Sequence, residues 1–101
     1  GGDLYVTQHD NDPEVTKGGN VLRFDGATGD LEEEFIPGGA ASGGLSGPIG
    51  ILLASGNRFF VTSAETDNVL QFSSTGDYLG TFASGNGLDG PIYIAYRAVR
   101  N

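Results

Sequence analysis

Two stretches of the chain repeat one another, and this repeat constrains the fold more than any other feature. Residues 44–51 read GLSGPIGI and residues 87–94 read GLDGPIYI. In each copy a Gly-rich turn leads to a Pro that opens an apolar, β-branched run. Pro is tolerated as the first residue of a strand, where its missing N–H does least harm. Each copy therefore predicts a loop that feeds a buried strand.

Further blocks of sequence repeat in the same order around these two stretches. Residues 1–7 match 56–62, residues 20–24 match 68–72, and residues 28–31 match 75–78, while Phe35 matches Phe82. The first copy is longer, and its extra residues fall in the loops, where insertions are tolerated. Self-similarity on this scale is the signature of a repeat architecture.

Apolar runs between Gly-rich turns predict seven or eight strands and no helix. We expect the strands at 3–8, 20–25, 30–37, 48–54, 57–63, 68–73, 77–83 and 91–99, the last ending as early as residue 96. A four-stranded unit of this length has the size of one β-propeller blade. The expected fold is therefore all-β, with four-stranded antiparallel propeller blades, about two of them in this chain.

The expected units divide the chain into three parts. Residues 1–47 hold strands two to four of one blade with a crossover loop, 48–90 form a complete blade, and 91–101 begin a further blade. Propellers have typically 4–8 blades, so two blades do not close a ring. The partners are therefore neighbouring blades, either of a longer chain or of a homo-oligomer. The start inside a repeat, without Met, favours a fragment of a longer protein.

The charge balance narrows the classes of partner. The 101 residues carry a net charge of −8 and contain no Cys. An acidic chain of this kind is not expected to bind a nucleic-acid backbone or an anionic membrane surface. No apolar run approaches the roughly 18 residues of a membrane-spanning helix, so membrane insertion is not expected. We expect an extracellular or cell-surface protein.

The repeated motifs resemble those of a known family. Pro48-x-Gly50-Ile51, then GNRFFVT at 56–62, NVLQF at 68–72 and Thr75-Gly76 are similar to NHL-type propeller repeats. They are also similar to streptogramin-lyase and gluconolactonase-like propellers. The resemblance implies propeller architecture but no single activity, because such repeats serve enzymes, binding scaffolds and structural proteins. One departure is Tyr93, which stands where the first copy has Gly50.

An acidic loop follows the first expected strand. Asp10, Asp12 and Glu14 alternate there, and Ca²⁺ favours several oxygen ligands from one flexible loop. Pro13 interrupts the run, and the glycine and glutamate of an EF-hand loop do not follow. The sequence thus leaves two alternatives open: these three residues bind calcium, or they form a solvated acidic loop. Calcium is the one cofactor that the sequence suggests.

His9 is the only histidine and the only side chain that ordinarily titrates near neutral pH. The resemblance to streptogramin lyases would make it the general base, although no catalytic signature surrounds it. A hydrogen-bonded loop histidine is the alternative. A gluconolactonase-like enzyme would need metal ligands from several blades, and this chain offers at most one contributing loop.

The acidic run 32–34 lies on an expected outer strand. Alternation separates Glu33 from Glu32 and Glu34, so a catalytic carboxylate pair is not predicted. Glu33 then shares the face of Leu31 and Phe35, an awkward place that a β-bulge or an early end of the strand would resolve. Arg23 and Lys17 are the expected ionic partners of these acids. The aromatic residues that recur with the blades are expected in the core: Tyr5, Tyr78, Phe24, Phe35, Phe72 and Phe82.

The sequence therefore favours a non-enzymatic binding or structural module that meets protein or glycan through its loops. The first alternative is a metal-dependent lyase or lactonase with its active site at the mouth of the ring. The second is a short chain of two blades that assembles into a multivalent ring.

Overall fold

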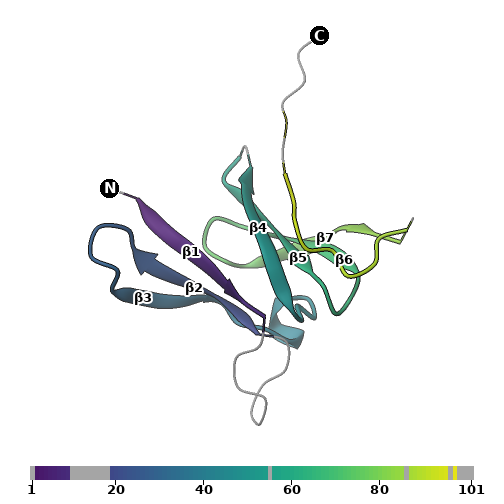
Figure 1. The fold of residues 1–101 in the computed structure, drawn as a ribbon, viewed down its shortest axis with the longest axis horizontal. Helices are drawn as coiled ribbons and strands as arrows, with labels where there is room; N and C mark the ends of the chain where they lie inside the picture. Colours follow the sequence, from purple (N-terminus) through teal and green to yellow (C-terminus); the bar gives the residue numbers. More distant parts are fainter. Residues whose placement is uncertain (1, 10–18, 55, 86, 96, 98–101) are drawn as a thin grey trace.

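The computed structural model describes residues 2–9, 19–54, 56–85, 87–95 and 97, and within them the fold is all-β (Figure 1). Two antiparallel sheets follow one another along the chain, and in each of them neighbouring strands are consecutive. The first holds β1 (Asp3–Gln8), β2 (Asn20–Asp25) and β3 (Leu31–Ile36); the second holds β4 (Pro48–Ala54), β5 (Arg58–Ser63), β6 (Asn68–Phe72) and β7 (Tyr78–Ser84). These seven strands agree with the expected ones to within one residue at each end.

Two segments differ from expectation. The crossover loop contains one turn of 3₁₀ helix, η1 (Ala40–Ser42), held by hydrogen bonds from the Ser42 amide to Gly39 and from the Leu45 amide to Ser42. Short 3₁₀ turns are frequent connectors, and apolar periodicity does not reveal them. The eighth strand is not found in residues 91–95. A strand needs a hydrogen-bonded neighbour, and no described strand pairs with this segment.

The two outermost hairpins close with equivalent turns. The Asp25 carboxylate accepts hydrogen bonds from the amides of Ala27 (2.8 Å) and Thr28 (3.0 Å). In the second sheet the Ser73 hydroxyl accepts from the amides of Thr75 (3.2 Å) and Asp77 (3.1 Å). Asp and Ser initiate turns because their side chains bond the backbone a few residues on. The two repeats thus build one turn with different acceptors.

The core lies between the two sheets, which pack face to face. An aromatic cluster joins them, with Tyr5 4.8 Å from both Phe35 and Phe59 and the latter two 5.1 Å apart between ring centroids. Such aromatic pairs stabilise by about 0.5–1.5 kcal/mol each beyond their buried area. The buried residues of this core come from both sheets and from the crossover loop: Val21, Phe35, Ile36, Leu45, Phe59, Val61, Leu70 and Phe72.

Each sheet keeps a second, less covered face. On the first sheet it carries Leu4, 58% exposed, opposite Phe24 on the next strand, and Leu31, 59% exposed. On the second sheet it carries Phe60 and Val69, against which Leu88 and Ile94 pack. The segment 88–94 therefore lies on the side of the second sheet that faces away from the first.

Candidate functional site

Polar side chains gather where the loops meet at one end of the two sheets. We define this loop edge by His9, Ser46, Gly47, Ser63 and Glu65. β1 ends just before His9 and β5 ends at Ser63, which Glu65 follows in the turn before β6. The crossover loop supplies Ser46 and Gly47 just before β4 begins. Repeat geometry explains the gathering, because loops between equivalent strands emerge on the same side.

Ser63 holds the crossover loop against the turn that follows β5. Its buried hydroxyl accepts a hydrogen bond from the Ser46 amide (2.9 Å) and donates to the Ser46 carbonyl (3.0 Å). The Glu65 amide donates to the same carbonyl at 3.1 Å. Because buried polar groups are costly unless bonded, this network fixes the loop edge in one arrangement.

His9 and Glu65 meet above Gly47. The Nε2 atom of His9 lies 4.0 Å from Oε2 of Glu65, and both side chains are partly exposed. A Cβ atom at Gly47 would lie 2.7 Å from Cγ of Glu65 and 3.1 Å from Nε2 of His9, and Gly47 has φ of 66°. A glycine at this position therefore lets the two side chains approach.

The loop edge brings a serine hydroxyl and a carboxylate together. The Ser46 hydroxyl donates its hydrogen bond to Oε1 of Glu65 at 2.5 Å. This hydrogen bond orients both side chains. What the arrangement offers is a cluster of hydroxyl, imidazole and carboxylate groups suited to hydrogen-bonding a polar ligand.

A second polar network lies at the same end of the first sheet. The Gln8 side-chain amide donates to Oδ1 of Asn20 (2.7 Å), and Asn20 donates to Oε2 of Glu34 (2.6 Å). Asn20 is buried. Glu34 thus has a buried amide as its partner.

Arg23 gathers the remaining acids of the run, as expected. Its guanidinium lies 3.0 Å from Glu33, 3.2 Å from Glu32 and 3.4 Å from Asp3. The hydrogen bond to Glu32, followed by the charges of the three acids, raises the pKa of Arg23. The pairing of β2 with β3 shifts register twice, so the expected irregularity is confirmed and Glu33 is opposite Arg23. Lys17 lies outside the described residues.

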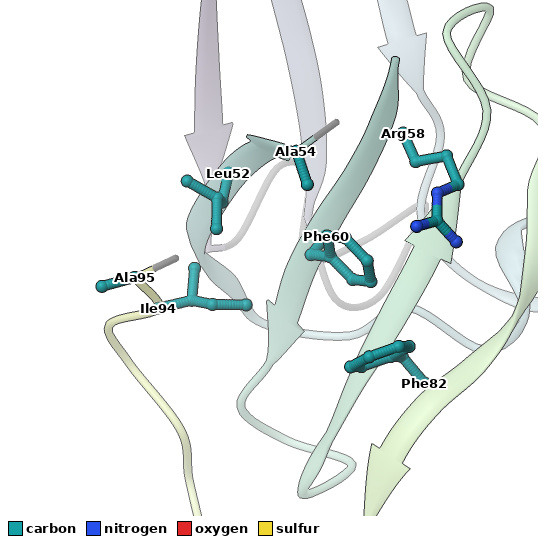
Figure 2. Close-up of a pocket in the computed structure, with 7 residues that line it drawn as sticks. All are labelled: Leu52, Ala54, Arg58, Phe60, Phe82, Ile94 and Ala95. Atoms are coloured by element: carbon teal, nitrogen blue, oxygen red, sulfur yellow. The ribbon is translucent and has the colours of Figure 1, made fainter. Parts of the chain in front are cut away.

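An apolar pocket of about 220 Å³ opens on the far face of the second sheet (Figure 2). Phe60 and Phe82 meet edge to face with centroids 4.7 Å apart, and the Arg58 guanidinium carbon lies 5.6 Å from the Phe60 ring centroid. Tyr78 and Phe82 are 38% and 60% exposed, so their expected place in the core is wrong. Phe35, the repeat partner of Phe82, is buried because the second sheet covers it. The pocket is lined by Leu52, Ala54, Arg58, Phe60, Phe82, Ile94 and Ala95.

The proposed calcium ligands Asp10, Asp12 and Glu14 lie outside the described residues, so the calcium hypothesis stays a prediction. Within the described part of the chain, no group of three or more His, Cys, Asp or Glu side chains could hold a metal ion. None of the helices described there is long and apolar enough to cross a membrane.

The chain was compared with protein-family models, with curated proteins and with solved structures, and none of them matches it.

Proposed function

We propose that the chain is a β-propeller module of about two blades with a non-enzymatic binding or structural role, at the cell surface or outside the cell. The fold supports the architectural part through two consecutive antiparallel sheets that stack face to face. The NHL-like motifs support it independently, because they coincide with the strands.

One observation carries this proposal: each sheet contacts the next unit in the same way. The Thr7 hydroxyl donates to the Ile49 carbonyl at 2.7 Å, and its repeat partner Thr62 donates to the Ile92 carbonyl at 3.2 Å. Ile92 is in turn the repeat partner of Ile49. Sheet, sheet and terminal segment therefore follow one another by one recurring relation, as blades do.

The apolar contacts recur with the same spacing. Leu45 is buried and Ile51 packs in the core between the sheets, while their partners Leu88 and Ile94 pack on the far face of the second sheet. The segment 88–94 thus starts a third unit although it forms no strand. This supports the division of the chain at residues 47 and 90.

The loop edge is the surface that we propose for binding. Its hydroxyl, imidazole and carboxylate groups are exposed in part and held by the Ser63 network, so a protein or glycan ligand would meet a preformed polar surface. The hydrogen bond from Ser46 to Glu65 orients both side chains for such a ligand.

The alternative of a lyase or lactonase rests on His9 and on the acidic loop that follows it. In that case Asp10, Asp12 and Glu14 would hold a divalent metal beside the only imidazole of the chain. The alternative of an assembling ring rests on the open sheet faces and is developed below.

The proposal is tested by titrating the chain with a panel of neutral and acidic glycans and short peptides while amide NMR shifts are followed. We expect the shifts to cluster at 46–47 and 63–66, and Glu65→Gln to weaken binding by at least about tenfold, the loss of one charge-assisted hydrogen bond. Asp77→Asn, in the turn at the opposite end of the strands, is the matched control.

Two results would contradict the proposal. Binding confined to surfaces other than the loop edge would remove its role in recognition. The enzymatic alternative would be favoured if the chain hydrolysed a lactone or cleaved a cyclic ester. This activity would have to be lost when metal is chelated and in the His9→Ala variant.

A further inference from the structure

The apolar far face of the second sheet is covered only in part. Leu88 and Ile94 pack on Phe60 and Val69, yet Phe82 remains 60% exposed beside an open pocket of about 220 Å³. In Figure 2 Ile94 reaches this pocket from the terminal segment, while Phe60 and Phe82 approach it from the sheet. Large exposed apolar side chains that line one hollow mark an interaction surface.

The other end of the stack has an open face with the matching pattern. Leu4, Val6, Leu22 and Phe24 are the repeat partners of Phe59, Val61, Leu70 and Phe72. The latter four are buried against the first sheet. The former lie on the opposite face of the first sheet, paired across strands as Leu4 with Phe24 and Val6 with Leu22.

The interface inside the chain therefore shows how these two open faces fit together. There the face of Tyr5, Val21 and Phe35 on the first sheet covers the face of Phe59 and Phe72 on the second. The open face of the second sheet carries Phe60, Val69 and Phe82, which are the repeat partners of Tyr5, Val21 and Phe35. The open face of the first sheet carries Leu4 and Phe24, which are the repeat partners of Phe59 and Phe72.

We propose that a second copy of the chain occupies the far face of the second sheet, with its first-sheet face of Leu4, Val6, Leu22 and Phe24 seated there. The contact continues the internal sheet-on-sheet packing from one copy to the next. It deepens the proposed function and rests on it, because it names the neighbouring blade as one supplied by another copy. Such a head-to-tail contact closes a ring or grows into a filament, depending on the rotation between copies.

Tyr93 marks a place where the contact must differ from the internal packing. A Cβ atom at Gly50 would lie 2.3 Å from the Ile92 carbonyl oxygen, so the terminal segment approaches β4 only because residue 50 is Gly. Tyr93 is the repeat partner of Gly50 and is 93% exposed. Between copies its side chain would meet the Ile49 carbonyl of the next copy. Tyr93→Gly is therefore expected to tighten the assembly, a result that general apolar adhesion does not predict.

The experiment measures the mass of the 101-residue chain in 0.15 M salt by light scattering and native mass spectrometry across a dilution series. Salt at this strength screens exposed charges beyond about 8 Å, which moderates the repulsion between copies of charge −8. Leu4→Glu blocks one face and Phe82→Glu blocks the other. Leu53→Glu is the matched control, because Leu53 is 54% exposed and belongs to neither face.

The blocked variants give a specific signature. We expect the native chain and Leu53→Glu to assemble, and each blocked variant to dissociate with a dissociation constant raised at least about tenfold, since a carboxylate would be buried without a partner. An equimolar mixture of the two blocked variants retains one intact pair of faces, so it should form a dimer and nothing larger.

Folding and alternative contacts are separated by additional measurements. Circular dichroism checks that each variant is folded. A second pair of single variants, Leu31→Glu on one face and Ala95→Glu on the other, repeats the design at two further exposed positions. A native chain that stays monomeric at about 100 μM, a blocked variant that still dimerises with itself, or a Tyr93→Gly variant that assembles more weakly would each overturn the inference. The glycan and peptide titration is independent, so a monomer that binds ligand at the loop edge would refute the assembly alone.

Discussion

The two sheets are copies of one unit, yet equivalent residues experience different surroundings. Phe72 is fully buried between the sheets, whereas its partner Phe24 is half-buried on an open face. Phe35 is buried, whereas its partner Phe82 is 60% exposed. Both members of each pair are phenylalanines at equivalent strand positions. Their burial is therefore decided by whether a neighbouring sheet covers them and not by the sequence of the strand.

The charged residues show a different kind of divergence. In the first sheet the cation Arg23 lies on the middle strand and contacts three acids. In the second sheet its partner is Gln71, and the cation Arg58 has moved to the neighbouring strand, where it donates to the Gln71 side chain. Surface pairs stabilise little, so the repeat tolerates such exchanges while its apolar positions stay constant.

The largest expected contrast is between Phe72→Ala and Phe24→Ala. Phe72→Ala should lower the free energy of unfolding by about 3–5 kcal/mol, because it opens a cavity in the closed interface. Phe24→Ala should cost only about 1–2 kcal/mol, since a half-buried side chain loses less apolar contact. Urea denaturation of the two variants, at a dilution where the chain is monomeric, measures the difference.

Equal losses for the two phenylalanines would mean that the outer face of the first sheet is covered in solution as well. If Phe72→Ala does not fold, the milder pair Phe72→Leu and Phe24→Leu keeps the comparison measurable, with the same order expected.

A smaller contrast is expected between the threonines that join successive units. Thr62→Val should cost about 1–3 kcal/mol, because the Gly50 amide donates to the Thr62 hydroxyl at 2.7 Å and would lose its partner. Thr7→Val should cost about 0.5–1.5 kcal/mol, since it removes the hydrogen bond from the Thr7 hydroxyl to the Ile49 carbonyl. Thermal and urea unfolding measure both, and a larger loss at Thr7 would contradict the extra cost expected when the Gly50 amide loses its acceptor.

Gly50→Ala tests how the terminal segment is seated. The added methyl would overlap the Ile92 carbonyl, so residues 91–95 must shift, at a cost of about 1–3 kcal/mol. The NMR contact between Ile94 and Phe60 should weaken. Gly2→Ala is the control, because a Cβ atom there meets no atom within 4 Å. An undisturbed Ile94 contact in Gly50→Ala would show that the segment is not held by this close approach.

The sequence predicted the strands well because apolar runs, Gly-rich turns and the repeat all agreed. It also predicted an irregularity near Glu33, since an acid on an apolar face demanded one. It misplaced Phe82 and expected a strand from residue 91 to between 96 and 99, because both depend on a neighbouring sheet that strand periodicity does not reveal. The loop edge was visible only through His9; the Ser46, Ser63 and Glu65 contacts join residues 17 to 19 positions apart through the fold.

The smallest effect is expected at the two hairpin turns, where the acceptors differ in whether they titrate. Hydrogen bonds from the Ala27 and Thr28 amides lower the pKa of Asp25 below its usual 3.8. The folded-state pKa is depressed, so its stabilisation is present above the ordinary pKa and is lost as the pH falls through the lower, folded-state value.

The Ser73 turn has no such dependence, because a hydroxyl keeps its acceptor lone pairs at every pH in this range. Asp25→Ser, which gives the first turn the acceptor of the second, should therefore flatten the loss of stability as the pH falls below about 4. Urea midpoints across this range measure the change, with Asp77→Asn as the control for an acid whose carboxylate does not accept those turn amides. An unchanged acid profile in Asp25→Ser would mean that the two turns, despite their different acceptors, contribute alike to the pH dependence of folding.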